Sequence, residues 1–428
     1  MEFQGVKGTR DFYPDDMRVR NWIVDAWRRV SLRNGFEEYD SPIFEYLDLF
    51  TVKSGQEIAG QLFNFVDRGG RQLAIRPEIT PSLARMVNAK INSLPRPIKW
   101  FSTPRLCRAE NPQKGRLREF FQWNVDVIGA DSILADAECI YVAVDLLREL
   151  GLSADDVRVR IGSRPLTIAA LRAAGVPAEF TDAALAVLDK GPKLSEEDFA
   201  RIAREAGLTD AQTAAVGRFQ QAGSVDELRE HFQGREDVRA RVEKDLDDLA
   251  ELFAALSAMG AGDYCTLDLR VVRGLAYYTG VVYEVFDRSG SLRAVAGGGR
   301  YDNLLEVLGG PKVGATGFGM GDVVLGILLA EKGKLPAPGG RIEYFVIEAD
   351  EASRPMVLEV VGALRRAGRS ADFNYRPQAL GKQLKAANRR GAGRAVIVRA
   401  DGLTVKDLAS GDQRDTTLAQ LLKAPAGG

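Results

Sequence analysis

The sequence predicts an α+β fold: a mainly antiparallel sheet core interrupted by a helical insertion, and then a small C-terminal α/β domain. Short apolar, strand-like runs alternate with helical segments in residues 1–163 and return, rich in glycine, in residues 261–331. Residues 164–260 between them are rich in alanine, arginine and acidic residues at helical spacing. A Pro/Gly-rich stretch, 332–341, has the composition of a linker, and residues 342–428 then have the strand and helix pattern of a small separate domain.

Composition narrows the function before any motif is considered. Hydrophobic content of 45% and charged content of 27% are ordinary for a soluble globular protein. No apolar run approaches the length of a membrane span and the first residues lack a signal-peptide core, so we expect a cytoplasmic protein that does not enter a membrane. Cys107, Cys139 and Cys265 are too few and too widely spaced for a disulfide framework or a zinc knuckle. The single histidine, His231, excludes a multi-histidine metal site and is expected at the surface of a charged helix.

Residues 105–129 form the first candidate site, because two strand-like runs flank a charged loop that contains Pro112 and Gly115. Within residues 105–119, five cations face only Glu110 and Glu119: Arg105, Arg108, Lys114, Arg116 and Arg118. An antiparallel pair of this kind can hold a polyphosphate along its strands while the loop reaches a second substrate. An ordinary hairpin loop is the alternative.

Two further segments have polar or glycine residues where a strand would favour apolar ones. Glu78 and Thr80 follow an apolar strand in "IRPEITPS" and could receive an ammonium group. Three consecutive glycines, 297–299, lie inside a strand-like run and suggest close backbone approach to a ligand. The run "GFGMGD" at 317–322 does not have the spacing of a dinucleotide-binding fingerprint, and no P-loop motif occurs.

Arg273 poses an open question at the start of "VRGLAYYTGVVYE", residues 272–284, which has a mainly strand-like pattern. It is either a surface arginine at a strand entrance or a fixed cation directed at an anionic ligand. A second basic segment, residues 376–399, contains seven cations and no acidic residue, on and around a helix expected at about 378–390. We interpret that segment as a nucleic-acid contact, although a solvated helix face is the usual explanation of a charge run.

Five segments, in this order, resemble the class II histidyl-tRNA synthetases: "GTRDFYP" (8–14), "RPEITPSLARM" (76–86), "RAENPQKGRLREFFQWNVDVIG" (108–129), "VRGLAYYTGVVYE" (272–284) and "AGGGRYDNLLEVLGG" (296–310). The segment "VKDLASGDQ" (405–413) resembles the C-terminal anticodon-binding domain of that family. The resemblance covers nearly the whole chain except the helical insertion. It implies a class II catalytic core in residues 1–163 and 261–331, and an enzyme that joins histidine to tRNA(His) through histidyl-adenylate, with ATP as substrate and Mg²⁺ accompanying the phosphates.

The resemblance also implies roles for individual residues, which the chemistry of adenylation requires. Arg108 and Arg273 would hold the α-phosphate during attack by the histidine carboxylate, because a rigid guanidinium fork suits the charge that develops there. Histidine would be bound by Glu78, Thr80, Gln122, Asp126, Tyr277, Tyr278 and Tyr301, with Asp126 and Tyr278 on the two imidazole nitrogens. ATP would also meet Glu110 and Arg116. The tRNA would meet Gln113, Arg118, Lys382, Lys385 and Arg389. No protein side chain is assigned to a metal.

Two further expectations and two departures follow from the same resemblance. "GFEEYDSPIFE" around Pro42 resembles the motif that builds the dimer interface, so we expect a homodimer. Val324 stands where many family members have an arginine that contacts the γ-phosphate, and Ala276 replaces a common aspartate. The alternative function is a non-catalytic paralogue, either the regulatory subunit of ATP phosphoribosyltransferase or a tRNA sensor.

Overall fold

The computed structural model describes residues 3–52, 60, 62–191, 194–272, 278–336 and 342–423. The chain divides into two compact units, Met1–Leu335 and Pro336–Gly428, so the division falls inside the Pro/Gly-rich stretch 332–341. Each unit is described by itself below. In the described parts of the chain, no helix is both long and apolar enough to span a membrane.

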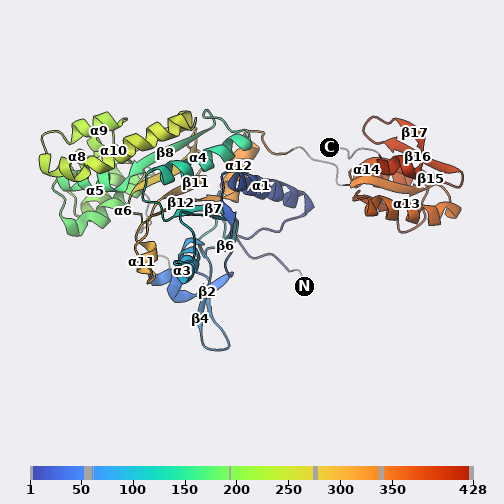
Figure 1. Cartoon of the computed structure of the whole chain (residues 1–428), viewed down its shortest axis with the longest axis horizontal. Helices are drawn as coiled ribbons and strands as arrows, with labels where there is room; N and C mark the ends of the chain where they lie inside the picture. Colours follow the sequence, from blue (N-terminus) through green and yellow to red (C-terminus); the bar gives the residue numbers. More distant parts are fainter. Residues whose placement is uncertain are drawn as a thin grey trace. The chain divides into compact units, whose positions relative to one another are not determined.

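The first unit is built on a nine-stranded sheet in the order β1-β5-β7-β12-β11-β10-β8-β9, with β6 paired to β7 (Figure 1). Only the outer pairs β1–β5 and β8–β9 are parallel, which confirms the predicted mainly antiparallel core. The strands are β1 (Glu37–Glu38), β5 (Ile98–Ser102), β6 (Arg105–Cys107), β7 (Glu119–Ile128), β8 (Val157–Ser163), β9 (Cys265–Leu267), β10 (Val281–Asp287), β11 (Ala296–Arg300) and β12 (Ala315–Gly321).

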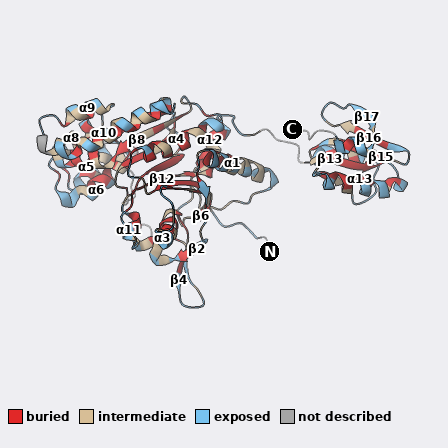
Figure 2. Ribbon diagram, in the orientation of Figure 1, coloured by how far each residue is buried: buried red, intermediate tan, exposed pale blue. Residues whose placement is uncertain are grey.

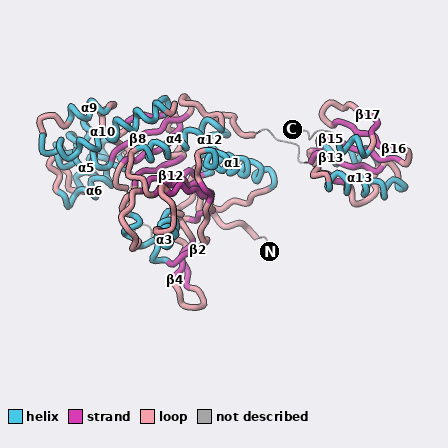
Figure 3. The backbone as a smooth tube through the Cα atoms, viewed as in Figure 1, coloured by secondary structure: helices cyan, strands magenta, loops and turns pink. Residues whose placement is uncertain are grey.

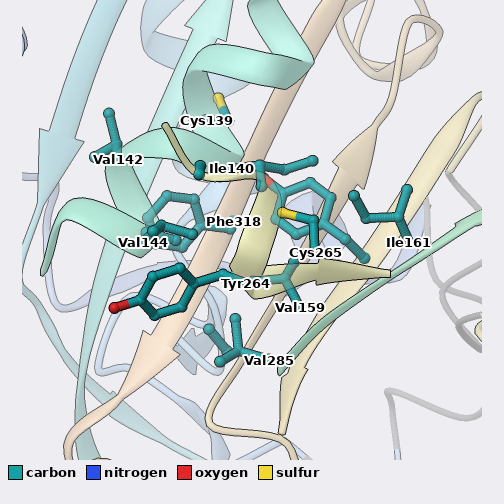
Figure 4. Packing of buried hydrophobic residues seen from close by; sticks show 14 of the residues in the cluster. Cys139, Ile140, Val142, Val144, Val159, Ile161, Tyr264, Cys265, Val285 and Phe318 are labelled. Carbon is teal, nitrogen blue, oxygen red and sulfur yellow. The ribbon is translucent and has the colours of Figure 1, made fainter. Parts of the chain in front are cut away.

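One face of this sheet is covered by the main hydrophobic core (Figure 2). Trp123, Val125 and Val127 of β7 point into it because alternate residues of a strand face opposite sides. Helices α1 (Pro14–Arg33), α4 (Leu134–Glu149) and α12 (Asp322–Glu331) supply its other side. Figure 4 shows the Cys139 and Cys265 sulfurs among branched aliphatic and aromatic side chains, and the described cysteines are free thiols. Burial raises the pKa of the Cys265 thiol to about 12, so it behaves as a core residue.

Residues 164–258 contain helices and no described strand, and Figure 1 shows them gathered beyond β8. Hydroxyl side chains begin several of these helices: Ser163 accepts from the Leu166 backbone N–H, and Thr209 from Gln212. The helices are α5 (Arg164–Ala173), α6 (Thr181–Lys190), α7 (Glu196–Glu205), α8 (Asp210–Phe219), α9 (Val225–His231) and α10 (Glu236–Ala258).

A separate three-stranded sheet, in the order β2-β4-β3, belongs to the first unit and precedes helix α3 (Thr80–Lys90). Its strands are β2 (Phe44–Tyr46), β3 (Asn64–Val66) and β4 (Gln72–Ile75). Large apolar side chains on and beside it are exposed: Ile43, Phe44, Tyr46, Phe65 and Val66. We call these five side chains the apolar strip.

The second unit is a five-stranded sheet in the order β14-β13-β15-β16-β17 (Figure 3). The period-two pattern of β13 (Ile342–Glu348) directs Tyr344 and Val346 toward helix α13 (Arg354–Arg366), whereas Phe345 and Ile347 pack with α14 (Leu380–Arg389). Both faces of the sheet are thus covered. The remaining elements are β14 (Ala371–Phe373), β15 (Ala392–Arg399), β16 (Gly402–Asp407), β17 (Gln413–Thr416) and α15 (Leu418–Lys423).

Candidate active site

On the face of the central sheet opposite the main hydrophobic core, β7 carries polar side chains. Gln122, Asn124 and Asp126 alternate with the core residues of the same strand and therefore lie on this opposite face. Asn124 and Asp126 are only 4% and 3% exposed, so their polar groups are removed from bulk water. Buried polar groups on a sheet face are costly unless they have partners, which directs attention to what lies beside them.

The residues directly across from these three on β12 are all glycines. Gly321 pairs with Gln122, Gly319 with Asn124 and Gly317 with Asp126. A Cβ on Gly317 would lie 2.5 Å from O of Val125 and 2.9 Å from Cγ of Asp126, and one on Gly319 would lie 2.7 Å from Nε2 of Gln122. The side chains of Asp126 and Gln122 therefore lean over β12 into space that any other residue would fill.

The glycines of β11 continue this floor, since Gly299 pairs with Gly317 and Gly297 with Gly319. A Cβ on Gly299 would lie 2.5 Å from O of Val281 and 2.9 Å from Cδ1 of Tyr278. These glycines were predicted to allow the close approach of a ligand. In the structure they first of all allow the close approach of neighbouring strands and of the Tyr278 ring. We call Gly297, Gly299, Gly317, Gly319 and Gly321 together the glycine floor.

Asp126 is held in place by Tyr301, whose hydroxyl donates to Oδ1 of the carboxylate. Tyr278 and Tyr301 are 5% and 3% exposed and pack in one cluster that also contains Tyr39. Tyr39 was not identified from the sequence. Burial raises the pKa of its phenol well above the ordinary value, and the nearby Asp126 carboxylate raises it further. Its buried hydroxyl has no hydrogen-bond partner among the described residues.

The segment that contains Glu78 and Thr80 is fixed by buried Arg76. Its Nη1 donates to Oδ1 of Asp40 at 2.7 Å and to O of Ser41 at 2.6 Å, while its backbone O accepts from the Cys107 N–H. Glu78 is 8% exposed and Thr80 begins helix α3. Arg76 was missed because an arginine just after a strand resembles a surface residue.

Arg108 lies next to this segment, because its Nε donates to O of Pro77 at 3.0 Å. Its guanidinium also lies 5.2 Å from the centre of the Phe120 ring on β7. The structure therefore brings together a predicted phosphate ligand and the two predicted ammonium ligands, Glu78 and Thr80. These contacts hold the guanidinium in a restricted set of positions, as anion recognition requires.

The loop between β6 and β7 closes as a tight turn, with backbone hydrogen bonds between Gln113 and Arg116 in both directions. Gly115 takes the left-handed conformation that this turn needs, with φ of +77°. Arg116 pairs with Glu110. The guanidinium of Arg118 donates to O of Glu110 at 3.1 Å, and Gln113 is exposed at the tip.

Asp322, two residues before the departure at Val324, is buried and has two partners. Oδ2 of this buried carboxylate accepts from Arg10 at 2.6 Å and Oδ1 accepts from the Phe121 backbone N–H at 2.9 Å. Burial raises the pKa of Asp322, whereas the Arg10 charge acts to lower it. Asp322 thus connects the N-terminal "GTRDFYP" segment to β7.

Several predictions fall outside the described residues or differ from the structure. Arg273 and Tyr277 lie in the undescribed stretch 273–277. The strand expected over 272–284 is wrong for residues 278–280, because β10 begins at Val281. His231 is half-buried between the rings of Phe219 and Phe232 rather than at the surface, and burial lowers its pKa.

The basic segment of the second unit is less uniformly cationic than its sequence indicates. Lys382, Lys385 and Arg389 are exposed on α14. Arg390, however, donates to Oδ2 of Asp372 at 2.9 Å, an acidic partner from β14 that lies just outside the basic segment. A window limited to residues 376–399 could not reveal this compensation.

Comparison with known proteins gives consistent results for both units. The profile of a family described as "Histidyl-tRNA synthetase" matches residues 8–321, and one described as "Anticodon binding domain" matches residues 341–424. The histidine–tRNA ligase of Opitutus terrae is 41% identical over 98% of this chain and 97% of its own length. The chloroplastic/mitochondrial histidine–tRNA ligase of Arabidopsis thaliana is 40% identical over 97% of this chain and 85% of its own.

Solved structures support the same fold. The histidyl-tRNA synthetase from Nostoc sp. PCC 7120 has a TM-score of 0.83 and 24% identity, with 99% of each chain covered. A protein from Bacillus halodurans described as an ATP phosphoribosyltransferase regulatory subunit/histidyl-tRNA synthetase has a TM-score of 0.76 and 23% identity, over 92% of this chain and 98% of that one. At these identities the structures show the fold, while the profile and the sequence relatives show the family. The chain therefore belongs to the histidyl-tRNA synthetase family.

Proposed function

We propose that the glycine floor and its surrounding side chains bind L-histidine and ATP, join them as histidyl-adenylate, and pass the histidyl group to the 3′ end of tRNA(His). As a member of its family the chain is an aminoacyl-tRNA synthetase. The observation that carries the placement is the register of β7 against β12, which sets three polar side chains opposite three glycines. We call the glycine floor together with Gln122, Asn124 and Asp126 the trough; its glycine backbone and polar side chains suit a ligand with several hydrogen-bonding groups.

The amino-acid end of the trough is assigned to Asp126 and its neighbours. An oriented carboxylate can accept a hydrogen bond from one imidazole nitrogen, and the Tyr301 hydroxyl holds its other oxygen. Glu78 and Thr80 would receive the ammonium group, with Gln122, Tyr277 and Tyr278 completing the pocket. A site that hydrogen-bonds both ring nitrogens discriminates against analogues lacking them by roughly 10⁴ or more.

The nucleotide end is assigned to the β6–β7 hairpin. Arg108 and Arg273 would clamp the α-phosphate, while Glu110 and Arg116 would lie along the remainder of ATP. The histidine carboxylate is already ionised at neutral pH and attacks the α-phosphorus without a general base, and pyrophosphate leaves. In the second step the terminal ribose hydroxyl of tRNA attacks the carbonyl carbon, and AMP leaves. Guanidinium groups stabilise the charge that develops on the phosphate oxygens.

Mg²⁺ is expected to enter with the phosphates of ATP. The described residues contain no cluster of three or more His, Cys, Asp or Glu side chains arranged to hold a metal. A phosphate-bound Mg²⁺ needs only one or two protein carboxylates and keeps several waters, so it does not require such a cluster. When bound, the ion would neutralise the charge of the outer phosphates.

The tRNA is assigned to two surfaces, one in each unit. Gln113 at the tip of the β6–β7 hairpin and Arg118 at its base would meet the acceptor end. Lys382, Lys385 and Arg389 on α14 would contact the anticodon region through phosphates, which gives affinity that decreases with salt. A tRNA ligase for protein synthesis would act in the cytoplasm, where we place this chain.

We also propose a homodimer formed through the apolar strip. Phe44 and Tyr46 are 51% and 58% exposed on β2, and contiguous apolar surface of this kind marks an interface. The expected result is a two-fold dimer by light scattering and a shift toward monomer for Phe44→Asp. Leu134→Asp is the matched control, because Leu134 is equally exposed, at 51%, on α4. A monomeric parent, or equal behaviour of both variants, would contradict the proposal.

Histidine-dependent exchange of pyrophosphate into ATP tests the first step, and charging of tRNA(His) tests the second. Both activities are expected from the purified chain. A regulatory paralogue would bind histidine without exchange. The presence of the C-terminal anticodon-binding match at 341–424 favours the ligase.

A further inference from the structure

The position that holds a γ-phosphate arginine in many relatives is apolar in this chain. Val324 on α12 is 7% exposed and belongs to the main hydrophobic core. It also lies against the β6–β7 hairpin, because a Cβ on Gly115 would be 3.3 Å from Cγ2 of Val324. The outer phosphates of ATP, beyond the part assigned to Arg108, therefore have no cation from this helix position.

A different arginine reaches the same place. Arg293 lies between β10 and β11, directly before the strand that carries part of the glycine floor. The same Cβ on Gly115 would lie 3.8 Å from Cδ of Arg293, so the Arg293 and Val324 side chains meet the hairpin at one point. Sequence reasoning did not single out Arg293, since "SLRAVAG" has only one charge and no motif spacing.

The surroundings of Arg293 are those of a cation that lacks an anion. Its Nη1 is buried and has no hydrogen-bond partner among the residues that the structure describes. Burial lowers the pKa of its guanidinium, and the Arg116 charge lowers it further, with only Glu110 acting in the opposite direction. Glu110 is already paired with Arg116. A desolvated guanidinium beside another one is unfavourable, and a bound polyanion would offset that cost.

We propose that Arg293 binds the outer, β- and γ-phosphates of ATP and so supplies the cation that Val324 cannot. The inference rests on the proposed function and adds a residue to its nucleotide end. Arg116 of the hairpin turn is close enough to act on the Arg293 charge, so both guanidinium groups could face the same phosphates. Lys114, next to Gly115 in the same hairpin, is exposed, and its ammonium faces Glu331 at 3.5 Å.

The test compares Arg293→Ala with Arg288→Ala, a control that removes an exposed arginine from the same β10–β11 connection. For Arg293→Ala we expect the KM for ATP in pyrophosphate exchange to rise about tenfold or more, by loss of a charge-assisted contact. The KM for histidine should stay within about twofold of the parent, because only the phosphates lose a partner. Arg288→Ala should match the parent in both constants.

Two further measurements separate phosphate binding from a structural role. Arg293→Ala should weaken equilibrium binding of ATP while leaving binding of AMP unchanged, because AMP lacks the outer phosphates. Arg288→Ala should bind both nucleotides as the parent does. If Arg293→Ala loses affinity for ATP and AMP equally, or leaves the KM for ATP unchanged, the inference is wrong. The proposed function still stands in that case, provided that the parent catalyses pyrophosphate exchange. A parent without exchange would instead overturn the proposed function.

Discussion

Gly317→Ala is the sharpest test of the glycine floor. The added Cβ would lie 2.5 Å from O of Val125, a backbone oxygen fixed in the β7–β12 ladder, and 2.9 Å from Cγ of Asp126. Real Cβ atoms do not approach so closely, so the strands must separate or the Asp126 side chain must move. Overpacking of this kind costs about 1–3 kcal/mol of the free energy of unfolding. A displaced Asp126 would also lose the hydrogen bond from Tyr301, and we propose that both residues bind histidine.

The assay measures thermal stability and both Michaelis constants for the same variant. We expect a Tm lowered by a few degrees and a KM for histidine raised roughly tenfold to a hundredfold, the equivalent of one hydrogen bond to a charged group. The KM for ATP should change far less. Gly326→Ala is the control, because its Cβ would have nothing within 4 Å and α12 would gain a better helix former. A Gly317→Ala variant with the Tm and histidine KM of the parent would refute the packing argument.

Three other predictions concern substitutions outside the glycines. Asp126→Asn should raise the KM for histidine more than the KM for ATP. Equal increases in the two constants would contradict the assignment of Asp126 to the imidazole. Arg273→Lys, argued from the sequence alone, should lower kcat for exchange by roughly 10² or more with little change in binding, whereas exchange within about threefold of the parent would mark a surface arginine. Asp156→Asn should destabilise the chain at neutral pH. Hydrogen bonds from the Ser153 N–H and from Lys332 lower the pKa of Asp156 to about 2. The ionised carboxylate therefore stabilises the folded chain fully above the unfolded pKa of about 3.9, and this stabilisation is lost as the pH falls through the folded pKa. The Tm difference from the parent should therefore narrow between pH 5 and about pH 2, and a constant difference would contradict this linkage.

The fold could be predicted to the extent that local pattern determines it. Helical spacing in residues 236–258 gives α10, and a short continuous apolar run at 344–347 gives β13, because a strand that is buried on both faces has such a run. The paired runs around "ENPQKG" gave an antiparallel hairpin, which the β6–β7 register confirms. Position-specific roles at the site came from the resemblance, since chemistry alone left Arg273 and the hairpin cations open.

The remaining features depend on contacts between distant segments. Asp372 compensates Arg390 across the second sheet, and Arg76 is buried by Asp40 and Ser41, which precede it by more than thirty residues. Neither contact leaves a periodic signal in the sequence. The run "GFGMGD", by contrast, has a periodic signal. Its glycines at 317, 319 and 321 alternate with Phe318 and Met320, the period of a strand whose two faces differ, and it was compared only with the spacing of a nucleotide-binding loop.

That alternation explains how the chain tolerates so many glycines in the middle of a sheet. Glycine in a strand loses backbone entropy on folding and offers no side chain to pack, so β12 is weak on its open face. Its other face compensates: Phe318 and Met320 are buried, and Phe318 packs edge-on against Trp123 of β7 with ring centres 5.0 Å apart. Trp123 in turn donates to Oγ of Ser31 on α1 at 2.9 Å. A slip of one residue in the β7–β12 register would place these rings in the trough and the glycines in the core. The core packing therefore fixes the register, and the register places Asp126 and Gln122 over the glycine floor.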